Sequence, residues 1–410
     1  MRIIPQKSTK FDEKITRFIQ KNLKYIFVVI VVIAAVIIRY LFAGFISGDT
    51  VLYFVPWAEH LSNNGGFAGI ATLQSDYPVA YQYLLAITTF LPFSALSRVK
   101  IIVMAFDFGN AIMVMALVKK LLKLPKNSFL PWIGFVISLF APTVLLNSAI
   151  WGQCDNIYTF FLLLTLYLLL GEHFLWAFVA YGLAFSFKLQ AIFLLPFLFF
   201  FYLKTRKLSL FNFLWIPVTY LLVYIPALLT GKPITQLFEA YSLQVVEYPQ
   251  MVLNLGNFYT LLPNDYAVLH IPAMILTGIV LLMSYGYFLS KTDLKIENEK
   301  LIDVALLTVL ICVYFLPGMH ERYLYAADVL AIVYLFIHSK RWILPLLVWL
   351  ISQNGYAPVL WGFGPIFDPK LLALVWLGLI GYLTWDVVKI TSQPPQENPS
   401  NIPLHPTPED

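Results

Sequence analysis

The sequence predicts an all-α protein that crosses a membrane many times and carries a large first loop outside the membrane. Of the 410 residues, 60% are apolar and only 12% are charged, and the mean hydropathy is +0.77. Apolar runs of roughly 17 to 25 residues, the length that a helix needs to cross a bilayer, recur between Tyr25 and Val388. Since backbone groups in lipid must bond within their own segment, we expect these runs to be helices.

About twelve transmembrane helices are expected along the chain. One further apolar segment, Tyr81–Leu96, is placed at the outer interface, because a span there would put the lysines of residues 119–126 outside the membrane. A thirteenth span at this segment is the alternative. The twelve predicted spans cover residues 25–45, 101–118, 130–147, 156–170, 174–187, 190–203, 211–229, 270–288, 302–317, 324–338, 342–354 and 371–388.

The basic residues fall on one side of these spans. Because cytoplasmic loops carry an excess of lysine and arginine, this side is predicted to be the cytoplasm, and both termini lie there. The remaining polar and ionisable residues are expected in outer loops or at outer helix ends, which makes the outer face the working face. The basic clusters occupy residues 2–24, 119–126, 204–207, 291–300, 340–341 and 389.

Three parts are expected along the chain. Residues 1–24 form a basic cytoplasmic N-terminus without the apolar core and cleavage site of a secretory signal. Residues 25–388 form a single membrane domain with its first outer loop at 46–100. The tail 389–410 is rich in Pro, Asn, Gln and Ser and is predicted to be disordered in the cytoplasm.

Asp49 is the leading catalytic candidate. It follows Gly48 at the outer end of the first span, and apolar residues at helical spacing over 51–61 predict a short interfacial helix behind it. A carboxylate at the mouth of a membrane cavity can act as a general base toward a hydroxyl. Capping of the following helix is the alternative role.

A second polar break, Ser148–Asp155, separates two apolar runs on the outer side. Gln153 and Asp155 are suited to bond sugar hydroxyls, and a capped turn explains them equally well. Trp151, two residues before Gln153, is an ordinary residue for a membrane interface.

Lys188 and Gln190 also lie between apolar runs, on the side where lysine is disfavoured. A cation at this depth needs a partner, and a lipid phosphate is the natural one. Snorkelling of the lysine to the surface is the alternative.

A charged turn follows residues 315–318 and consists of His320, Glu321 and Arg322. Arg322 is suited to clamp a phosphate at two points, and His320 to donate a hydrogen bond to its oxygens. An exposed charged turn is the alternative. No metal site is predicted, because the histidines are scattered and the carboxylates are not paired at ligand spacing.

These outer motifs resemble those of the GT-C membrane glycosyltransferases, which take a sugar from dolichyl or undecaprenyl phosphate. In the dolichyl-phosphate-glucose glucosyltransferases the first lumenal loop carries Gly-Asp, Trp-x-Glu and Asp-Tyr-Pro-Pro. The chain is similar at Gly48-Asp49, Trp57-Ala58-Glu59 and Asp76-Tyr77-Pro78, with Val79 in place of the second proline. It also resembles bacterial proteins related to GPI mannosyltransferases.

Three later motifs extend the resemblance over most of the chain. Lys188-Leu189-Gln190 is similar to a Lys-Gln element near the donor phosphate, although Leu189 interrupts it. His320-Glu321-Arg322 resembles a His-Glu-Lys turn. The segment 254–258, which includes Asn257, is similar to a late lumenal Asn-Phe element.

The resemblance implies an inverting transfer in a plasma membrane. A hexose, glucose or mannose, would pass from a polyprenyl-phosphate donor to a glycan, lipid-linked or protein acceptor outside. Asp49 would deprotonate the acceptor, and Lys188, His320 and Arg322 would hold the phosphate. No cofactor is required, although some relatives use a divalent metal. The residues implied for binding sugar or acceptor are Asp76, Tyr77, Gln153, Asp155, Gln190, Glu321 and Asn257.

Other functional classes have less support. The sequence has no Walker-type loop, no G-x-S-x-G motif and no basic patch with interleaved aromatics, which argues against nucleotide hydrolysis, serine catalysis and nucleic-acid binding. A transporter or a flippase for lipid-linked sugars is the main rival, but the internal symmetry common in transporters is not seen. A non-catalytic scaffold in envelope assembly would make the outer carboxylates and Lys188 dispensable.

Overall fold

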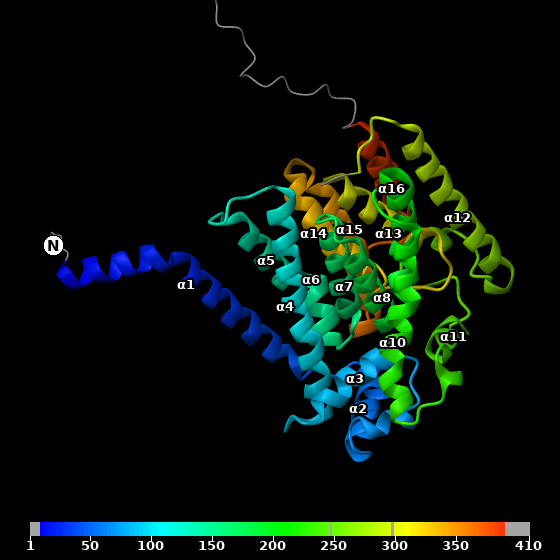
Figure 1. Cartoon of the computed structure of the whole chain (residues 1–410), viewed down its shortest axis with the longest axis horizontal. Helices are drawn as coiled ribbons and strands as arrows, with labels where there is room; N and C mark the ends of the chain where they lie inside the picture. Colours follow the sequence, from blue (N-terminus) through cyan, green and yellow to red (C-terminus); the bar gives the residue numbers. More distant parts are fainter. Residues whose placement is uncertain (1–8, 247, 297–298, 390–410) are drawn as a thin grey trace, which may run out of the picture.

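Helices make up most of the described chain in the computed structural model, which describes residues 9–246, 248–296 and 299–389 (Figure 1). The first part comprises α1 (Lys10–Ala43), η1 (Thr50–Phe54), α2 (Val55–Asn63), η2 (Ala68–Ala71), α3 (Val79–Thr88) and α4 (Ala95–Leu121). The middle comprises α5 (Leu130–Phe140), α6 (Pro142–Leu145), η3 (Leu146–Trp151), α7 (Asp155–Leu169), α8 (Phe174–Phe187), η4 (Leu189–Leu194), α9 (Leu195–Thr205), η5 (Leu210–Leu214) and α10 (Trp215–Leu229). The last part comprises η6 (Ile234–Gln236), α11 (Glu239–Val246), β1 (Val252–Leu253), η7 (Phe258–Leu261), α12 (Tyr266–Ser290), α13 (Glu299–Phe315), β2 (Met319–His320), α14 (Tyr325–Ile337), η8 (Ser339–Arg341), α15 (Ile343–Trp361) and α16 (Pro369–Lys389).

The first helix begins earlier than the predicted span. Thr9 caps α1: its hydroxyl accepts a hydrogen bond from the Asp12 N–H, and the Asp12 carboxylate accepts one from the Thr9 N–H at 2.7 Å. The segment 1–24 is therefore helical from residue 10, and the boundary expected at residue 25 does not interrupt α1. Residues 1–8 and 390–410, the latter predicted to be disordered, lie outside the described residues.

Every predicted span coincides with helix, which bears out an all-α protein of the membrane type, but the number twelve is not reached. Six described helices are long and apolar enough to cross a membrane, and a seventh span results if α5 and the α6–η3 segment count as one. Several other predicted spans are shorter: α7 has 15 residues, α8 has 14 and α14 has 13. A 14-residue helix extends about 21 Å, less than a bilayer core of about 30 Å.

Proline and extended residues divide the apolar runs into these shorter pieces. The segment predicted to span at 130–147 bends by 48° between Phe140 and Pro142. Ala141 is extended (φ −57°, ψ 130°) because the ring of a following proline disfavours the helical conformation. The backbone is also extended at Lys188 (φ −156°, ψ 137°), which separates α8 from η4, although the residue that follows is Leu189 and not a proline.

The loop after α1, predicted to lie outside the membrane, contains the short helix expected behind Asp49. η1 and α2 form a continuous helical segment from Thr50 to Asn63. The segment Tyr81–Leu96 contributes to α3, which has only 10 residues and is too short for a thirteenth span. α3 packs instead against α2, α4, α8 and α10.

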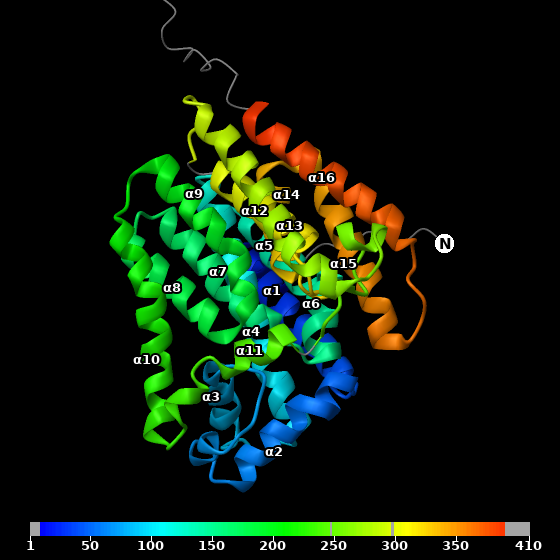
Figure 2. The same cartoon turned by 90° about the vertical axis from the view of Figure 1, so that its right-hand side faces the viewer.

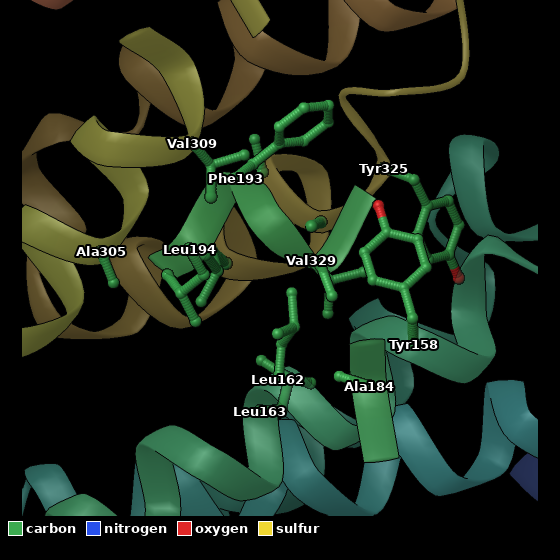
Figure 3. Packing of buried hydrophobic residues seen from close by; sticks show 14 of the residues in the cluster. Tyr158, Leu162, Leu163, Ala184, Phe193, Leu194, Ala305, Val309, Tyr325 and Val329 are labelled. Atoms are coloured by element: carbon green, nitrogen blue, oxygen red, sulfur yellow. The ribbon is translucent and has the colours of Figure 1, made fainter. Parts of the chain in front are cut away.

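One hydrophobic core joins α7, α8, η4, α13 and α14. Leu162 and Leu163 of α7, Ala184 of α8 and Val309 of α13 meet there in the close view (Figure 3). α13 is buried on all sides from residue 300 to 315, which explains why its sequence is apolar without a polar stripe. α13 also contacts η4, the segment that follows the interruption at Lys188.

The two ends of the molecule differ in charge. The lysine-rich α4–α5 loop, the C-terminal end of α12 and the C-terminal end of α16 lie toward one end, and α2 and α3 lie at the other (Figures 1 and 2). This is the arrangement that the one-sided distribution of lysine and arginine requires.

The expectation that the remaining ionisable groups gather in outer loops is wrong for several buried residues within helices. Arg39 of α1 pairs with Asp107 of α4 at 2.9 Å, and both side chains are buried. Asp328 of α14 is buried and accepts a hydrogen bond from Ser352 at 2.7 Å. These carboxylates are tolerated because each one has a hydrogen-bonding partner across a helix interface.

Candidate functional site

Asp49 lies between α1 and η1 and is held by the polar break at residues 148–155. Its Oδ2 accepts hydrogen bonds from Trp151 Nε1 at 2.9 Å and from Gln153 Nε2. Its side chain makes no capping bond to η1, so the alternative role as a helix cap is not observed. The side chain is partly exposed.

The backbone of residues 146–153 fixes these two donors. The π-helical turn η3 ends at Gly152, whose φ of +82° suits glycine, and a Cβ there would lie 2.9 Å from Thr50 Cγ2. Lys100 Nζ donates to the carbonyl oxygens of Ala149 (2.7 Å) and Ile150, and to that of Phe45 at 3.1 Å. The end of α1 and the turn that presents Trp151 are therefore clamped to α4 together.

Lys188 and Asp155 form a buried ion pair. Lys188 Nζ lies 2.5 Å from Asp155 Oδ1, and the exposed fractions of the two side chains are 2% and 0%. The other carboxylate oxygen of Asp155 accepts from Asn147 Nδ2 at 3.0 Å. Snorkelling of Lys188 to the surface is thus not observed, and the anion beside it is a protein carboxylate.

Tyr77 connects this ion pair to Asp49. Its hydroxyl donates to Gln153 Oε1 at 3.2 Å, and Lys188 Nζ lies 5.4 Å from the centre of its ring. Burial raises the pKa of Tyr77 well above its usual value, so the hydroxyl remains a neutral donor. A continuous polar chain thus runs from the Asp49 carboxylate through Gln153 and Tyr77 to Lys188.

In the charged turn His320 and Glu321 are buried and Arg322 is half-buried, so the alternative of an exposed turn is wrong. Arg322 Nη1 donates to Glu321 Oε1 at 3.0 Å, and its Nε is buried without a hydrogen-bond acceptor. Burial raises the pKa of Glu321, while Arg322 opposes the shift. Burial also lowers the pKa of His320 well below its usual value, with Arg322 and Lys188 adding to the effect, so this ring is neutral at pH 7.

Trp151 brings the turn and Asp49 together. The guanidinium carbon of Arg322 lies 5.7 Å from the centre of the indole whose N–H binds Asp49. Tyr356 of α15 packs edge-on against the same indole at 5.3 Å. From the sequence, Trp151 is expected to be an ordinary residue of the membrane interface. Its position next to Gly152 and Gln153 in a polar break is the sequence signal that could have identified it as part of the site.

An apolar cavity of about 340 Å³ adjoins the turn. His320 and Gln190 line it together with side chains from α12 and the 316–319 segment. Tyr248 packs edge-on against His320 at 5.0 Å. The parallel pairing of β1 and β2, with Leu253 opposite His320, holds the loop after α11 against this turn.

The other residues predicted to bind sugar or acceptor are Gln190, Asp76 and Asn257, and they have different surroundings. Gln190 is buried beside Tyr323 and lines the apolar cavity. The carbonyl oxygen of Asp76 accepts from Gln244 of α11 at 2.6 Å. Asn257 is engaged by backbone groups instead: it accepts from the Tyr259 N–H at 3.0 Å and donates to the Val313 carbonyl oxygen, so it shapes η7 and is not joined to the Asp49 cluster.

Within the described part of the chain, no three metal-binding side chains of the His, Cys, Asp or Glu type gather in one place. The two cysteines, Cys154 and Cys312, are free and buried.

Comparison with known proteins adds no family. No protein-family model matches the chain, and a search of curated proteins finds no match. The resemblance to GT-C glycosyltransferases therefore rests on the sequence motifs alone.

Proposed function

We propose that this protein is a GT-C-type glycosyltransferase that transfers a hexose from a polyprenyl phosphate to an acceptor outside the membrane. The observation that carries the proposal is the shared indole of Trp151: its N–H binds the Asp49 carboxylate, and its ring faces the Arg322 guanidinium. A candidate base and a candidate phosphate clamp thus lie against one rigid side chain. Inverting transfer needs such a pair on the two sides of an anomeric carbon.

In this mechanism Asp49 takes the proton of the acceptor hydroxyl. The two described donors both bind Oδ2, which leaves Oδ1 to accept that proton. The acceptor oxygen bonds to the anomeric carbon, and the bond from that carbon to the phosphate oxygen breaks, with its electron pair leaving on the phosphate. Arg322 then balances the charge of the departing lipid phosphate, and the N–H of neutral His320 donates to it. No step in this mechanism requires a cofactor.

The apolar cavity beside His320 supports a lipid donor. Its apolar lining suits isoprene units, and His320 and Gln190 in its wall would lie next to the phosphate that ends the lipid chain. Lys188 would act through its pair with Asp155 and over the Tyr77 ring, shaping the sugar pocket. We place this site on the outer side of a plasma membrane, with both termini of the chain in the cytoplasm.

The test is transfer of radiolabelled sugar from synthetic polyprenyl-phosphate glucose or mannose by the purified chain in nanodiscs, with extracts of candidate acceptors. Asp49→Asn should lower the transfer rate by at least about 100-fold, the usual contribution of a general base. Glu59→Gln is the matched control, since Glu59 is an exposed carboxylate of the same outer loop, and it should leave the rate unchanged.

Two outcomes would count against the proposal. Equal rates for Asp49→Asn and wild type would remove Asp49 as the base. No transfer by the wild type, combined with movement of a labelled lipid across proteoliposomes, would favour a transporter or flippase.

A further inference from the structure

Five lysines converge on one cavity at the end of the molecule opposite to α2 and α3. The cavity has a volume of about 650 Å³ and lies among α1, α4, α5 and α7, and no aspartate or glutamate lines it within the described residues. The lysines are Lys24, Lys119, Lys120, Lys123 and Lys126.

The backbone gathers them from three places. Lys119 and Lys120 end α4, Lys123 follows in a left-handed turn with φ 50°, and Lys126 precedes α5. Lys24 reaches the cavity from α1 and lies 5.4 Å from the centre of the Trp132 ring. The α4–α5 connection is therefore shaped so that its cations face one hollow.

The general excess of lysine in cytoplasmic loops explains why these lysines lie on one side of the membrane. It does not explain why five of them surround one cavity. At the same end of the molecule, Lys207 pairs with Glu172, and Lys204 donates to the carbonyl oxygens of Phe288 and Lys291. In contrast, none of the five lysines forms an ion pair with a described residue, and only Lys120 has a hydrogen-bond acceptor, the Tyr167 carbonyl oxygen at 3.1 Å. Cations left together without carboxylates repel one another unless an anion joins them.

We propose that this cavity binds a phosphate-bearing anion at the cytoplasmic face. The headgroup of an anionic membrane lipid fits best, because apolar side chains such as Met115 and Pro131 line the cavity beside the lysines. Trp132 and Tyr167 add the aromatic rings that are common at headgroup depth. This site is separate from the proposed transferase site and does not depend on it.

The experiment measures the thermal unfolding of the purified full chain in detergent with phosphatidylglycerol, phosphatidylcholine or inorganic pyrophosphate. Phosphatidylglycerol should raise the midpoint in the wild type and bind as one retained lipid in native mass spectrometry. The triple variant Lys119→Gln/Lys123→Gln/Lys126→Gln should lose both effects. Lys207→Gln/Lys291→Gln/Lys295→Gln removes as many lysines elsewhere at the same end and should keep them.

Single variants test the same site with a smaller change to the folded protein. Lys123→Gln and Lys126→Gln change exposed side chains, and each should weaken phosphatidylglycerol binding about fivefold. A shift with pyrophosphate but not with the lipid would support the site and identify a soluble source of the phosphate. Equal shifts in both triple variants, or no shift with either anion in the wild type, would overturn the proposal.

Discussion

Lys188 and Asp155 form an ion pair in the protein interior, with 2.5 Å between Nζ and Oδ1. Lys188→Met would leave that carboxylate buried without a cation, and we expect a loss of about 3–5 kcal/mol of stability. The double variant Lys188→Met/Asp155→Asn should recover most of the loss, since neither charge remains. Thermal unfolding in detergent of the wild type and the three variants, including Asp155→Asn alone, measures this coupling.

The same set of variants distinguishes a structural role of the Lys188–Asp155 pair from a role in sugar transfer. If the pair shapes the sugar pocket as proposed, the double variant should be stable but transfer poorly. A double variant with wild-type transfer would limit Lys188 and Asp155 to holding the fold. A double variant no more stable than Lys188→Met would mean that the two charges are not coupled.

At this scale the sequence identifies ionisable residues but not their partners. Asp49, Lys188 and Arg322 stand out because a charged group next to an apolar run is costly unless it is used. The need of Lys188 for an anion is also predictable, yet the anion that the fold supplies is a carboxylate 33 residues earlier in the chain. Arg39 and Asp107 were open to the same reasoning, since each lies within a predicted span.

Among the elements, the turn η3 depends most on one residue. Gly152→Ala would place a Cβ 2.9 Å from Thr50 Cγ2 and force alanine into a left-handed conformation that costs about 1–2 kcal/mol. Trp151 and Gln153 should then move away from Asp49, and we expect transfer to fall about tenfold or more, with a lower unfolding midpoint. The transfer assay and thermal unfolding measure the two effects.

Gly278→Ala is the matched control for this change. Gly278 lies inside α12, and nothing is within 4 Å of the position of its Cβ. Alanine there should keep full transfer and raise stability slightly, because it favours helix over the unfolded chain. Wild-type transfer by Gly152→Ala would show that the turn tolerates the change and that its geometry does not set the rate.

The elements themselves were largely predictable, because hydropathy alone locates each apolar run. Their lengths were not, since the run of residues 130–147 gives no sign of how far Pro142 bends it. The start of α1 at Lys10 is set by the N-cap at Thr9, and a hydropathy profile does not detect helix caps. A count of spans therefore overestimates the number of full-length helices in this fold.

For the whole molecule, the orientation in the membrane can be measured directly. Both natural cysteines are buried, so single cysteines introduced at exposed sites should react without background. We expect Asn63→Cys, in the first outer loop, to react with a membrane-impermeant maleimide on intact cells. Asn127→Cys, in the α4–α5 loop, should react only after permeabilisation. Reaction of Asn127→Cys on intact cells would reverse the orientation and move the candidate site to the cytoplasm.

The indole of Trp151 also acts as a mechanical spacer. Tyr356 supports one side of it, Asp49 is bonded to its N–H, and Arg322 lies over its ring. The flat ring holds Asp49 at its N–H edge and Arg322 over its face, so we expect a shift of the ring to move both groups together. Any closure of this site around a substrate has to carry the whole turn of residues 146–153 as a rigid unit.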